Sequence, residues 1–397
     1  MREEELRRLL TVAAEDVRPS HPAGTAWERA RRVRHTRRAV GAAALAVALA
    51  GGGTVFALRP PVGPPPIVAD PSVTDLTPTH APPVQRPPAT LAFRADPLAR
   101  LTDPATAPLS REPVRRALAL YQPVDAEYRA DGPVRVLGDD GVVRSLDVVD
   151  LEPTRDAGGN EAPALKPGVL SPDGRTAAFA QTGELVLVDL TTAGVRRVPL
   201  DGYLELVVWA GDRVLVGGDD RTYAVDRSSG AAARIDVSAW DVSAPDPAAG
   251  RGAALVELSG MRDGLTLRSR SAGDGALRTE QRVGQGDLPA SYRVNEFYGR
   301  GWLRGDRVAR AAWITSREID GAEGVAVLDA RTGAVAHLLD LGRDRTKGCC
   351  EVLGWAEGGT VLLRLTPDAG LARWDPETGE ITGVLRELQG LVSLAAG

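Results

Sequence analysis

A short phrase recurs along the last two-thirds of this chain. In each copy a large apolar residue precedes a tight polar turn, and a run of β-forming residues follows the turn. Copies that return every ~40–50 residues are typical of a β-propeller, in which each repeat is one four-stranded blade. The copies are Leu170-Ser171-Pro172-Asp173-Gly174-Arg175, Trp209-Ala210-Gly211-Asp212-Arg213-Val214, Trp302-Leu303-Arg304-Gly305-Asp306-Arg307-Val308 and Trp355-Ala356-Glu357-Gly358-Gly359-Thr360-Val361.

A second turn follows each copy at a similar distance. Aspartate and threonine cap local backbone groups in such turns, and glycine supplies a positive φ. Alternating apolar runs, such as residues 185–188 and 325–328, lie between the two turns. We therefore expect an all-β domain with six blades between about Val124 and Leu388, and a seventh blade assembled from the edges is the alternative. The second turns start at Asp189, Asp226, Asp329 and Asp375.

The phrase in its clearest form resembles the S-P-D-G motif of TolB-like and WD-repeat-like bacterial propellers. The match is best over residues 165–200, and the Gly-His and Trp-Asp pair of the eukaryotic WD repeat is missing. The Asp-x-x-Thr-Gly turns are also similar to those of quinoprotein dehydrogenase propellers, although His337 and Gly383 stand where those repeats carry tryptophan. The resemblance implies the propeller fold and says little about function.

A transmembrane helix is predicted at residues 39–58, which carry no charged side chain. A helix of this length spans the ~30 Å hydrocarbon core of a bilayer. Six arginines crowd residues 29–38, whereas only Arg59 follows before Asp70. The positive-inside rule then puts the N-terminus in the cytoplasm and the propeller outside the cell membrane. A signal peptide cleaved after Val55-Phe56-Ala57 is the alternative, and it exports the propeller as well.

Three other parts complete the predicted organisation. Residues 1–38 form a cytoplasmic segment whose amphipathic helix contacts either a partner protein or the lipid surface. Residues 59–90 are rich in proline and form a semi-rigid extracytoplasmic linker. Residues 91–397 form the propeller domain, with Leu170, Trp209, Trp302 and Trp355 in its core.

The composition excludes several classes of function. A net charge of −5 is too small in magnitude, and of the wrong sign, to indicate a nucleic-acid partner. Of the four histidines only His337 lies in the propeller. The propeller therefore has too few histidines for a multi-histidine metal site, and only one that could serve in a Ser-His-Asp catalytic arrangement. Phosphate-loop and Gly-x-Ser-x-Gly motifs are absent from the sequence. We therefore expect no cofactor, no metal site and no catalytic residue.

The two cysteines, Cys349 and Cys350, are adjacent. Zinc sites use four ligands at spacings that this chain lacks. We expect two thiols at the start of a strand, one facing each side. A vicinal disulfide, which an oxidising envelope permits, is the alternative.

A binding site is predicted where turns and long loops carry carboxylates on one rim of the propeller. In a propeller the turns between second and third strands share a face with the loops between blades. Converging carboxylates can bind a cation or a basic ligand, although Asp-Gly is also what ordinary hairpin turns use. The predicted binding residues are Asp139, Asp140, Arg155, Asn160, Glu161, Asp219 and Asp220.

The favoured function is a membrane-anchored extracytoplasmic propeller that binds or senses an envelope protein or a cell-wall ligand. One alternative is a membrane regulator whose residues 1–38 bind a cytoplasmic protein. Its layout resembles that of anti-sigma factors, although the zinc-binding histidines and cysteines of the common anti-sigma domain are missing. Another alternative is an exported lyase or glycosidase that works through rim carboxylates.

Overall fold

The computed structural model describes residues 82–395, with gaps at 219–220, 253, 318, 344, 346–347 and 367–368. The predicted cytoplasmic segment, the transmembrane helix and most of the linker lie outside these residues. In the described part, the chain forms β-strands and four short 3-10 helices but no α-helix. No helix there is long and apolar enough to cross a membrane.

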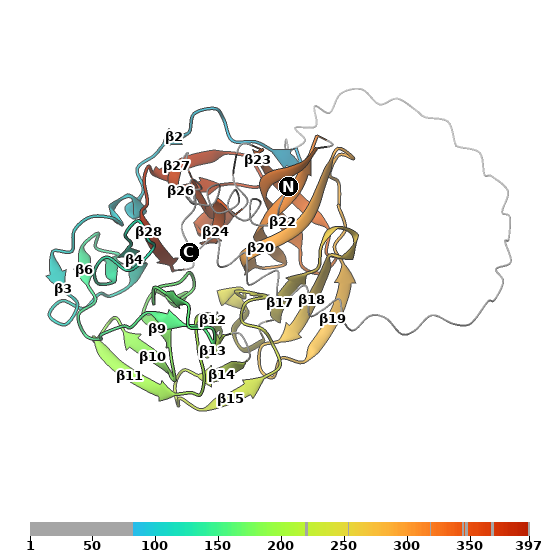
Figure 1. The fold of residues 1–397 in the computed structure, drawn as a ribbon. Helices are drawn as coiled ribbons and strands as arrows, with labels where there is room; N and C mark the ends of the chain where they lie inside the picture. The colour runs from blue at the N-terminus through green and yellow to red at the C-terminus, as the bar shows by residue number, and fades with distance from the viewer. Residues whose placement is uncertain are drawn as a thin grey trace, which may run out of the picture. The chain divides into compact units, whose positions relative to one another are not determined.

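The strands form six blades around one axis (Figure 1), which confirms the predicted fold and blade count. In blades two to six the strands follow the chain order from the axis outward, and neighbouring strands are antiparallel. Blade two starts at Leu170, which bridges to Ala177, and continues with β9 (Thr176–Gln181), β10 (Glu184–Asp189) and β11 (Gly194–Pro199). Blade three is β12 (Leu206–Ala210), β13 (Arg213–Gly217), β14 (Thr222–Asp226) and β15 (Ala232–Ile235).

The next three blades complete the ring toward the C-terminus. Blade four is β16 (Val242–Ser243), β17 (Ala254–Ser259), β18 (Thr266–Ser271) and β19 (Leu277–Arg282). Blade five is the longest and contains β20 (Tyr292–Arg304), β21 (Arg307–Ser316), β22 (Ile319–Asp329) and β23 (Val335–Gly342). Blade six is β24 (Cys350–Trp355), β25 (Val361–Leu365), β26 (Ala369–Trp374) and β27 (Ile381–Leu385).

Blade one joins the two ends of the propeller. Its innermost strand is β28 (Gly390–Leu394), which pairs antiparallel with β4 (Ala117–Pro123), and β5 (Arg135–Gly138) and β6 (Val143–Ser145) lie outside them. The amide of Leu170 also donates to Oγ of Ser393 at 2.8 Å, which ties blade one to blade two. The ring therefore needs residues on both sides of the predicted range 124–388, because its closing strand comes from the C-terminal part of the chain.

A belt formed by residues 82–108 runs along the outer edges of blades five, six and one (Figure 1). It adds one short parallel strand to each: β1 (Val84–Gln85) on β23, β2 (Ala92–Phe93) on β27 and β3 (Ala107–Pro108) on β6. The compact unit that contains the propeller begins at Ala81. The belt thus starts inside residues 59–90, the range predicted as linker. Its short strands pair with the outer edges of complete blades, and such pairing does not need alternating apolar residues in the belt.

Side chains between the blades form an almost wholly aliphatic core, as the low aromatic content predicts. Leu170, Trp209 and Trp355 are buried as predicted, with exposed fractions of 2%, 5% and 6%. Trp302 is only half-buried. It packs against two of the buried clusters, so its predicted place in the core is confirmed only in part.

The two ends of the ring, the loop face and the turn face, carry different connections. The loop face carries the links between blades and the turns between second and third strands. The turn face carries the first-to-second turns, such as 171–175, and the third-to-fourth turns, such as 226–230. At the latter, Oδ1 of Asp226 accepts the amides of Ser228 and Ser229 at 3.0 and 2.8 Å, and Gly230 has a φ of 78°. This is the predicted turn chemistry.

Candidate functional site

The predicted site residues Asp139 and Asp140 lie in the turn between β5 and β6. Asp140 makes a bidentate ion pair with Arg144, at 2.7 and 3.1 Å, and the hydrogen bond from Arg144 lowers the pKa of Asp140. Asp139 pairs with Arg115. Arg144 is buried. The Asp140 carboxylate therefore neutralises the charge of Arg144 and not that of a bound ligand.

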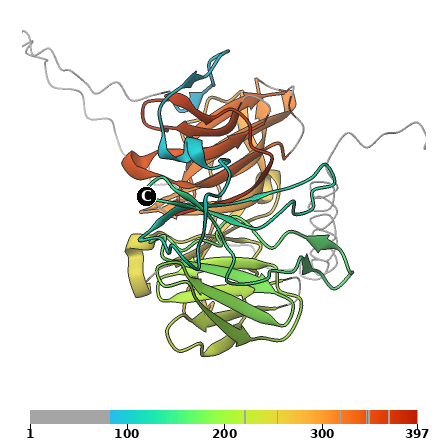
Figure 2. The same cartoon turned by 90° about the vertical axis from the view of Figure 1, so that its left-hand side faces the viewer.

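The predicted residues Arg155, Asn160 and Glu161 lie in a hairpin of β7 (Thr154–Arg155) and β8 (Glu161–Ala162), within the link from blade one to blade two. Arg155 pairs with Glu161 across the hairpin at 2.6 Å. The backbone and side-chain amides of Asn160 both donate to the carboxylate of Asp156, at 2.8 and 2.7 Å. These contacts stabilise the hairpin, which projects from one side of the ring in Figure 2.

The structure does not bring these two groups together. Because β28 supplies the innermost strand of blade one, the turn with Asp139 and Asp140 joins the third and fourth strands and lies on the turn face. The β7–β8 hairpin lies on the loop face. The predicted shared rim is therefore divided between opposite ends of the propeller. Asp219 and Asp220 lie outside the described residues.

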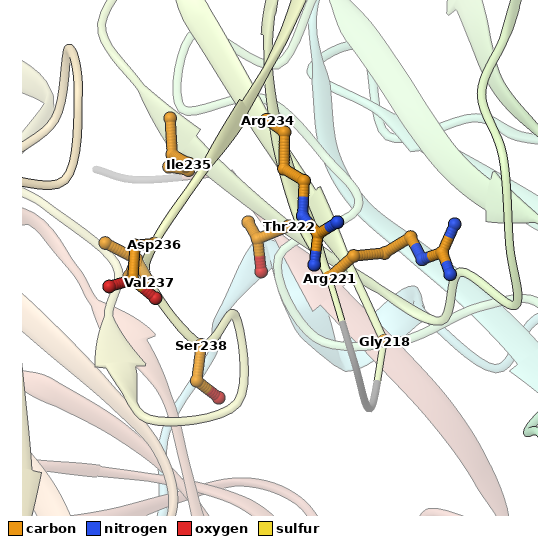
Figure 3. A pocket seen from close by; sticks show the side chains of 8 residues that line it. All are labelled: Gly218, Arg221, Thr222, Arg234, Ile235, Asp236, Val237 and Ser238. Atoms are coloured by element: carbon orange, nitrogen blue, oxygen red, sulfur yellow. The ribbon is translucent and has the colours of Figure 1, made fainter.

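A pocket of about 430 Å³ lies at the edge of blade three, beside Gly218 after β13 and Arg221 before β14 (Figure 3). Its lining combines the side chains of Arg221, Arg234 and Asp236 with the hydroxyl of Thr222. Thr222 is buried and its Oγ1 accepts the amide of Ala239 at 3.3 Å. The pocket is polar and belongs to the loop face.

A second cavity, of about 240 Å³, lies on the propeller axis. Pro172 and Asp246 line it and belong to first-to-second turns, and Arg304, which also lines it, is the last residue of β20 before such a turn. The cavity therefore lies at the turn-face end of the axis. Every blade contributes to its wall, through Leu394, Leu170, Trp209, Pro245, Trp302 and Trp355 in blades one to six. This axial cavity is the candidate functional site.

Three tryptophans of the axial cavity are fixed by hydrogen bonds between blades. The indole N–H of Trp209 donates to the carbonyl of Val169 at 3.1 Å. The indole of Trp302 donates to the carbonyl of Val352 at 2.9 Å, and the indole of Trp355 donates to the carbonyl of Trp302 at 2.8 Å. Because the polar atom of each indole already has a partner, the rings offer the cavity apolar surface.

Arg300 extends from blade five to blades two and three, and it also lines the axial cavity. Its Nη1 donates to the carbonyls of Pro167 and Val207 at 2.6 and 2.5 Å. Its Nη2 is buried and has no hydrogen-bond partner among the described residues. Burial lowers the pKa of Arg300 to about 10, although the charge of Glu351 acts in the opposite direction. The guanidinium nevertheless stays protonated at neutral pH.

A bulge in β20 places Arg300 in this position. The register with β21 passes from Tyr298–Ala311 to Trp302–Ala309, so residues 299–301 face a single residue of the partner strand. Bulges of this kind re-aim side chains. Gly299 has a φ of 64°, and a Cβ on Gly168 would lie 1.9 Å from Nη1 of Arg300. Glycine is therefore required on both sides of the contact.

The axial cavity was not predicted from the sequence, although the sequence contains a signal for it. The recurring tryptophans mark the ends of the inner strands, which is where the cavity lies. Gly299-Arg300-Gly301 interrupts the hydrophobic alternation of residues 292–304 with an arginine between two glycines. Such an interruption in a strand indicates a bulge.

Two further results concern metals and cysteines. No group of histidine, cysteine and carboxylate side chains that could hold a metal ion occurs among the residues with described positions. Cys349 and Cys350 are joined in a vicinal disulfide at the start of β24. The expected pair of free thiols is therefore wrong, and the alternative is what the structure contains.

Comparison with known proteins finds only distant similarity to solved structures. No family model and no curated relative matches the chain. TolB from Acinetobacter baumannii is 18% identical with a TM-score of 0.43, over 70% of this chain and 66% of that chain. BamB from Moraxella catarrhalis is 16% identical with a TM-score of 0.33, over 66% and 73%. The N-terminal domain of Nup159 is 11% identical with a TM-score of 0.36, over 79% and 88%.

Proposed function

We propose that this chain is a non-catalytic binding module that is held at the membrane by residues 39–58 with its propeller on the outer side. The observation that carries binding is the axial cavity. All six blades contribute to its wall, which contains three tryptophans and two arginines, Arg300 and Arg304. Closing a ring of strands does not require charged side chains at the axis, so this wall is better explained as a recognition surface.

The membrane part of the proposal is supported by charge. Arginines precede residues 39–58 in excess and are scarce after them, and this asymmetry favours an N-terminus in the cytoplasm. A reporter fused after Pro78, ahead of the belt, tests the topology. Alkaline phosphatase at this point should be active and a cytoplasmic reporter inactive, and the reverse result would refute the outer placement.

Photocrosslinking in intact cells tests where the propeller meets its partner. Benzoylphenylalanine placed at Ala248 samples the wall of the axial cavity at an exposed position. The same residue placed at Asn160 samples the exposed tip of the β7–β8 hairpin. We expect a discrete adduct from position 248 only. An adduct from position 160 alone would favour the rim predicted from the sequence, and no adduct from either would contradict the binding of a protein partner at these surfaces.

The proposed contact of residues 1–38 with a cytoplasmic protein stays a prediction, since these residues lie outside the described part of the chain. The two contacts are compatible with each other. A module that recognises a ligand outside and a protein inside would transfer a signal across the membrane, which is the sensing function expected from the sequence.

A further inference from the structure

The axial cavity contains a positive charge that no hydrogen-bonded carboxylate of the described residues neutralises. Arg300 donates to two carbonyl groups, of Pro167 and Val207, and its Nη2 has no partner in the described part of the chain. Buried charges are normally paired, and a buried donor without an acceptor is unfavourable. An anion bound beside Nη2 would supply the acceptor that this atom lacks among the described residues.

The position of Arg300 is built by several independent elements. The bulge at residues 299–301 directs the side chain across the axis, and Gly168 on the opposite blade leaves room for it. The carbonyl of Gly299, exposed by the bulge, accepts Nε of Arg310 at 3.1 Å. Residues of three blades thus hold the guanidinium of Arg300 at the cavity, and Arg310 stabilises the bulge that carries it.

The other charges of the wall indicate the charge of the ligand. Arg304 donates to the carbonyl of Ala356. Asp246 accepts the amides of Ala248, at 2.8 Å, and of Gly305. The wall therefore holds two arginines and one carboxylate, and the negative charge of Glu351 also acts on Arg300 from outside the wall. This small excess of positive charge fits a monoanion better than a phosphate dianion.

The size and the surface of the cavity indicate the uncharged part of the ligand. Its volume of about 240 Å³ lies just below the range of ~300–1,000 Å³ that is usual for drug-sized ligands. The wall presents the rings of Trp209, Trp302 and Trp355, whose N–H groups are already bonded. A small apolar or aromatic group fits this surface.

We propose that the axial cavity binds a small monocarboxylate that carries an apolar group. The carboxylate neutralises Arg300, with a small shift of the guanidinium that brings Nη2 to a carboxylate oxygen, and the apolar group lies against the tryptophans. This assignment rests on the proposed binding function and names its ligand class. The carboxylate can belong to a free organic acid or to the C-terminus of a peptide, and the chemistry of recognition is the same.

Calorimetric titration of the full chain in detergent tests the assignment, with tryptophan fluorescence as a second readout. Benzoate should bind in a saturable way and change the fluorescence. Benzamide, its neutral analogue, should bind about ten- to a hundredfold more weakly, since it lacks the charge-assisted hydrogen bond. Inorganic phosphate should bind no better than benzamide. Equal affinities for benzoate and benzamide would overturn the proposal.

A pair of peptides distinguishes the two sources of carboxylate. Acetyl-Ala-Phe with a free C-terminus is compared with its C-terminal amide. Tighter binding of the free acid than of benzoate identifies a peptide terminus as the source, and weaker binding identifies a free organic acid. An amide that binds as well as the free acid would count against carboxylate recognition.

Variants link the binding to Arg300. Arg300→Met should lose about ten- to a hundredfold in benzoate affinity, whereas Arg197→Met, on the outer strand β11, should retain the parent value. If Arg300→Met does not fold, Ala248→Trp provides the test, because it obstructs the wall at an exposed position and leaves Arg300 in place. Unchanged benzoate affinity in either folded variant would overturn the proposal.

The two proposals can fail separately. Adducts from position 248 without binding of any carboxylate would reject the ligand class and leave the binding function intact. Binding of benzoate through Arg300 without adducts at position 248 would reject a partner at this surface and leave the carboxylate site intact.

Discussion

Replacing Gln85 by leucine should detach the belt from the propeller. The side chain is 5% exposed and links β1 to blade six in two directions. Its Nε2 donates to the carbonyl of Pro376 at 2.6 Å, and its Oε1 accepts the indole N–H of Trp374 at 2.6 Å. Trp374 is fully buried, so water cannot replace the lost partner without opening the blade.

The expected cost follows from these two hydrogen bonds. A buried donor or acceptor left without a partner costs about 1–3 kcal/mol, and leucine recovers part of this by apolar contact. We expect Gln85→Leu to lower the free energy of unfolding by about 2–4 kcal/mol. Gln281→Leu is the matched control. Gln281 makes only a 3.4 Å contact with the carbonyl of Ala330, and its replacement should change stability by less than about 0.5 kcal/mol.

Urea unfolding of the full chain in detergent measures both values, and limited proteolysis reports release of the belt near residues 82–95. A double-mutant cycle with Trp374→Phe isolates the hydrogen bond. Because removing both partners leaves fewer unpaired groups, the double variant should be more stable than the sum of the single changes by about 1 kcal/mol or more. Additive effects, or a Gln85→Leu protein as stable as the parent, would refute the proposed attachment.

Three further predictions concern other parts of the propeller. Trp302→Ala should cost about 2–4 kcal/mol in urea unfolding, because it removes a half-buried ring and the bond to Val352, and a loss below about 1 kcal/mol would contradict this packing. Asp140→Asn should cost about 1–2 kcal/mol by leaving the buried Arg144 without its carboxylate, and unchanged stability would make this ion pair dispensable. His337 should make stability depend on pH: burial lowers its pKa, so the unfolded state binds a proton that the folded state does not. Stability should therefore decrease as pH falls through about 6.5, and His337→Gln should reduce the difference in Tm between about pH 7.5 and about pH 5.5; equal differences would exclude this role.

Much of the fold could be predicted because each blade repeats a local rule. Alternating apolar residues and Asp-Gly turns specify a strand, a turn and the next strand within a few residues of sequence. The closing strand, residues 390–394, could not be predicted in this way, since its pairing with β4 joins distant segments. The start of the belt, at Val84–Gln85, was missed for a related reason: a strand of two residues, in a segment that begins among prolines, shows no hydrophobic period.

The candidate site was harder to predict than the fold. Charged turn residues such as Asp140 and Glu161 attract attention in a sequence, yet in the structure each has a partner in its own turn or hairpin. The glycines on either side of Arg300 indicate a bulge but do not show what its side chain contacts. Its importance depends on carbonyls of blades two and three, which only the closed ring brings near. The flanking glycines were the available signal.

The belt and the closing strand also determine the order in which this chain can assemble. Domains usually fold from the N-terminus as synthesis proceeds. Here, the first strands of the propeller to be synthesised cannot pair fully until the last strands have been made. β1 has no partner until β23 exists, and the inner edge of β4 stays unpaired until β28 arrives. Open strand edges attract other chains. A nascent propeller of this design therefore depends on being kept apart from its neighbours until its final strand is complete.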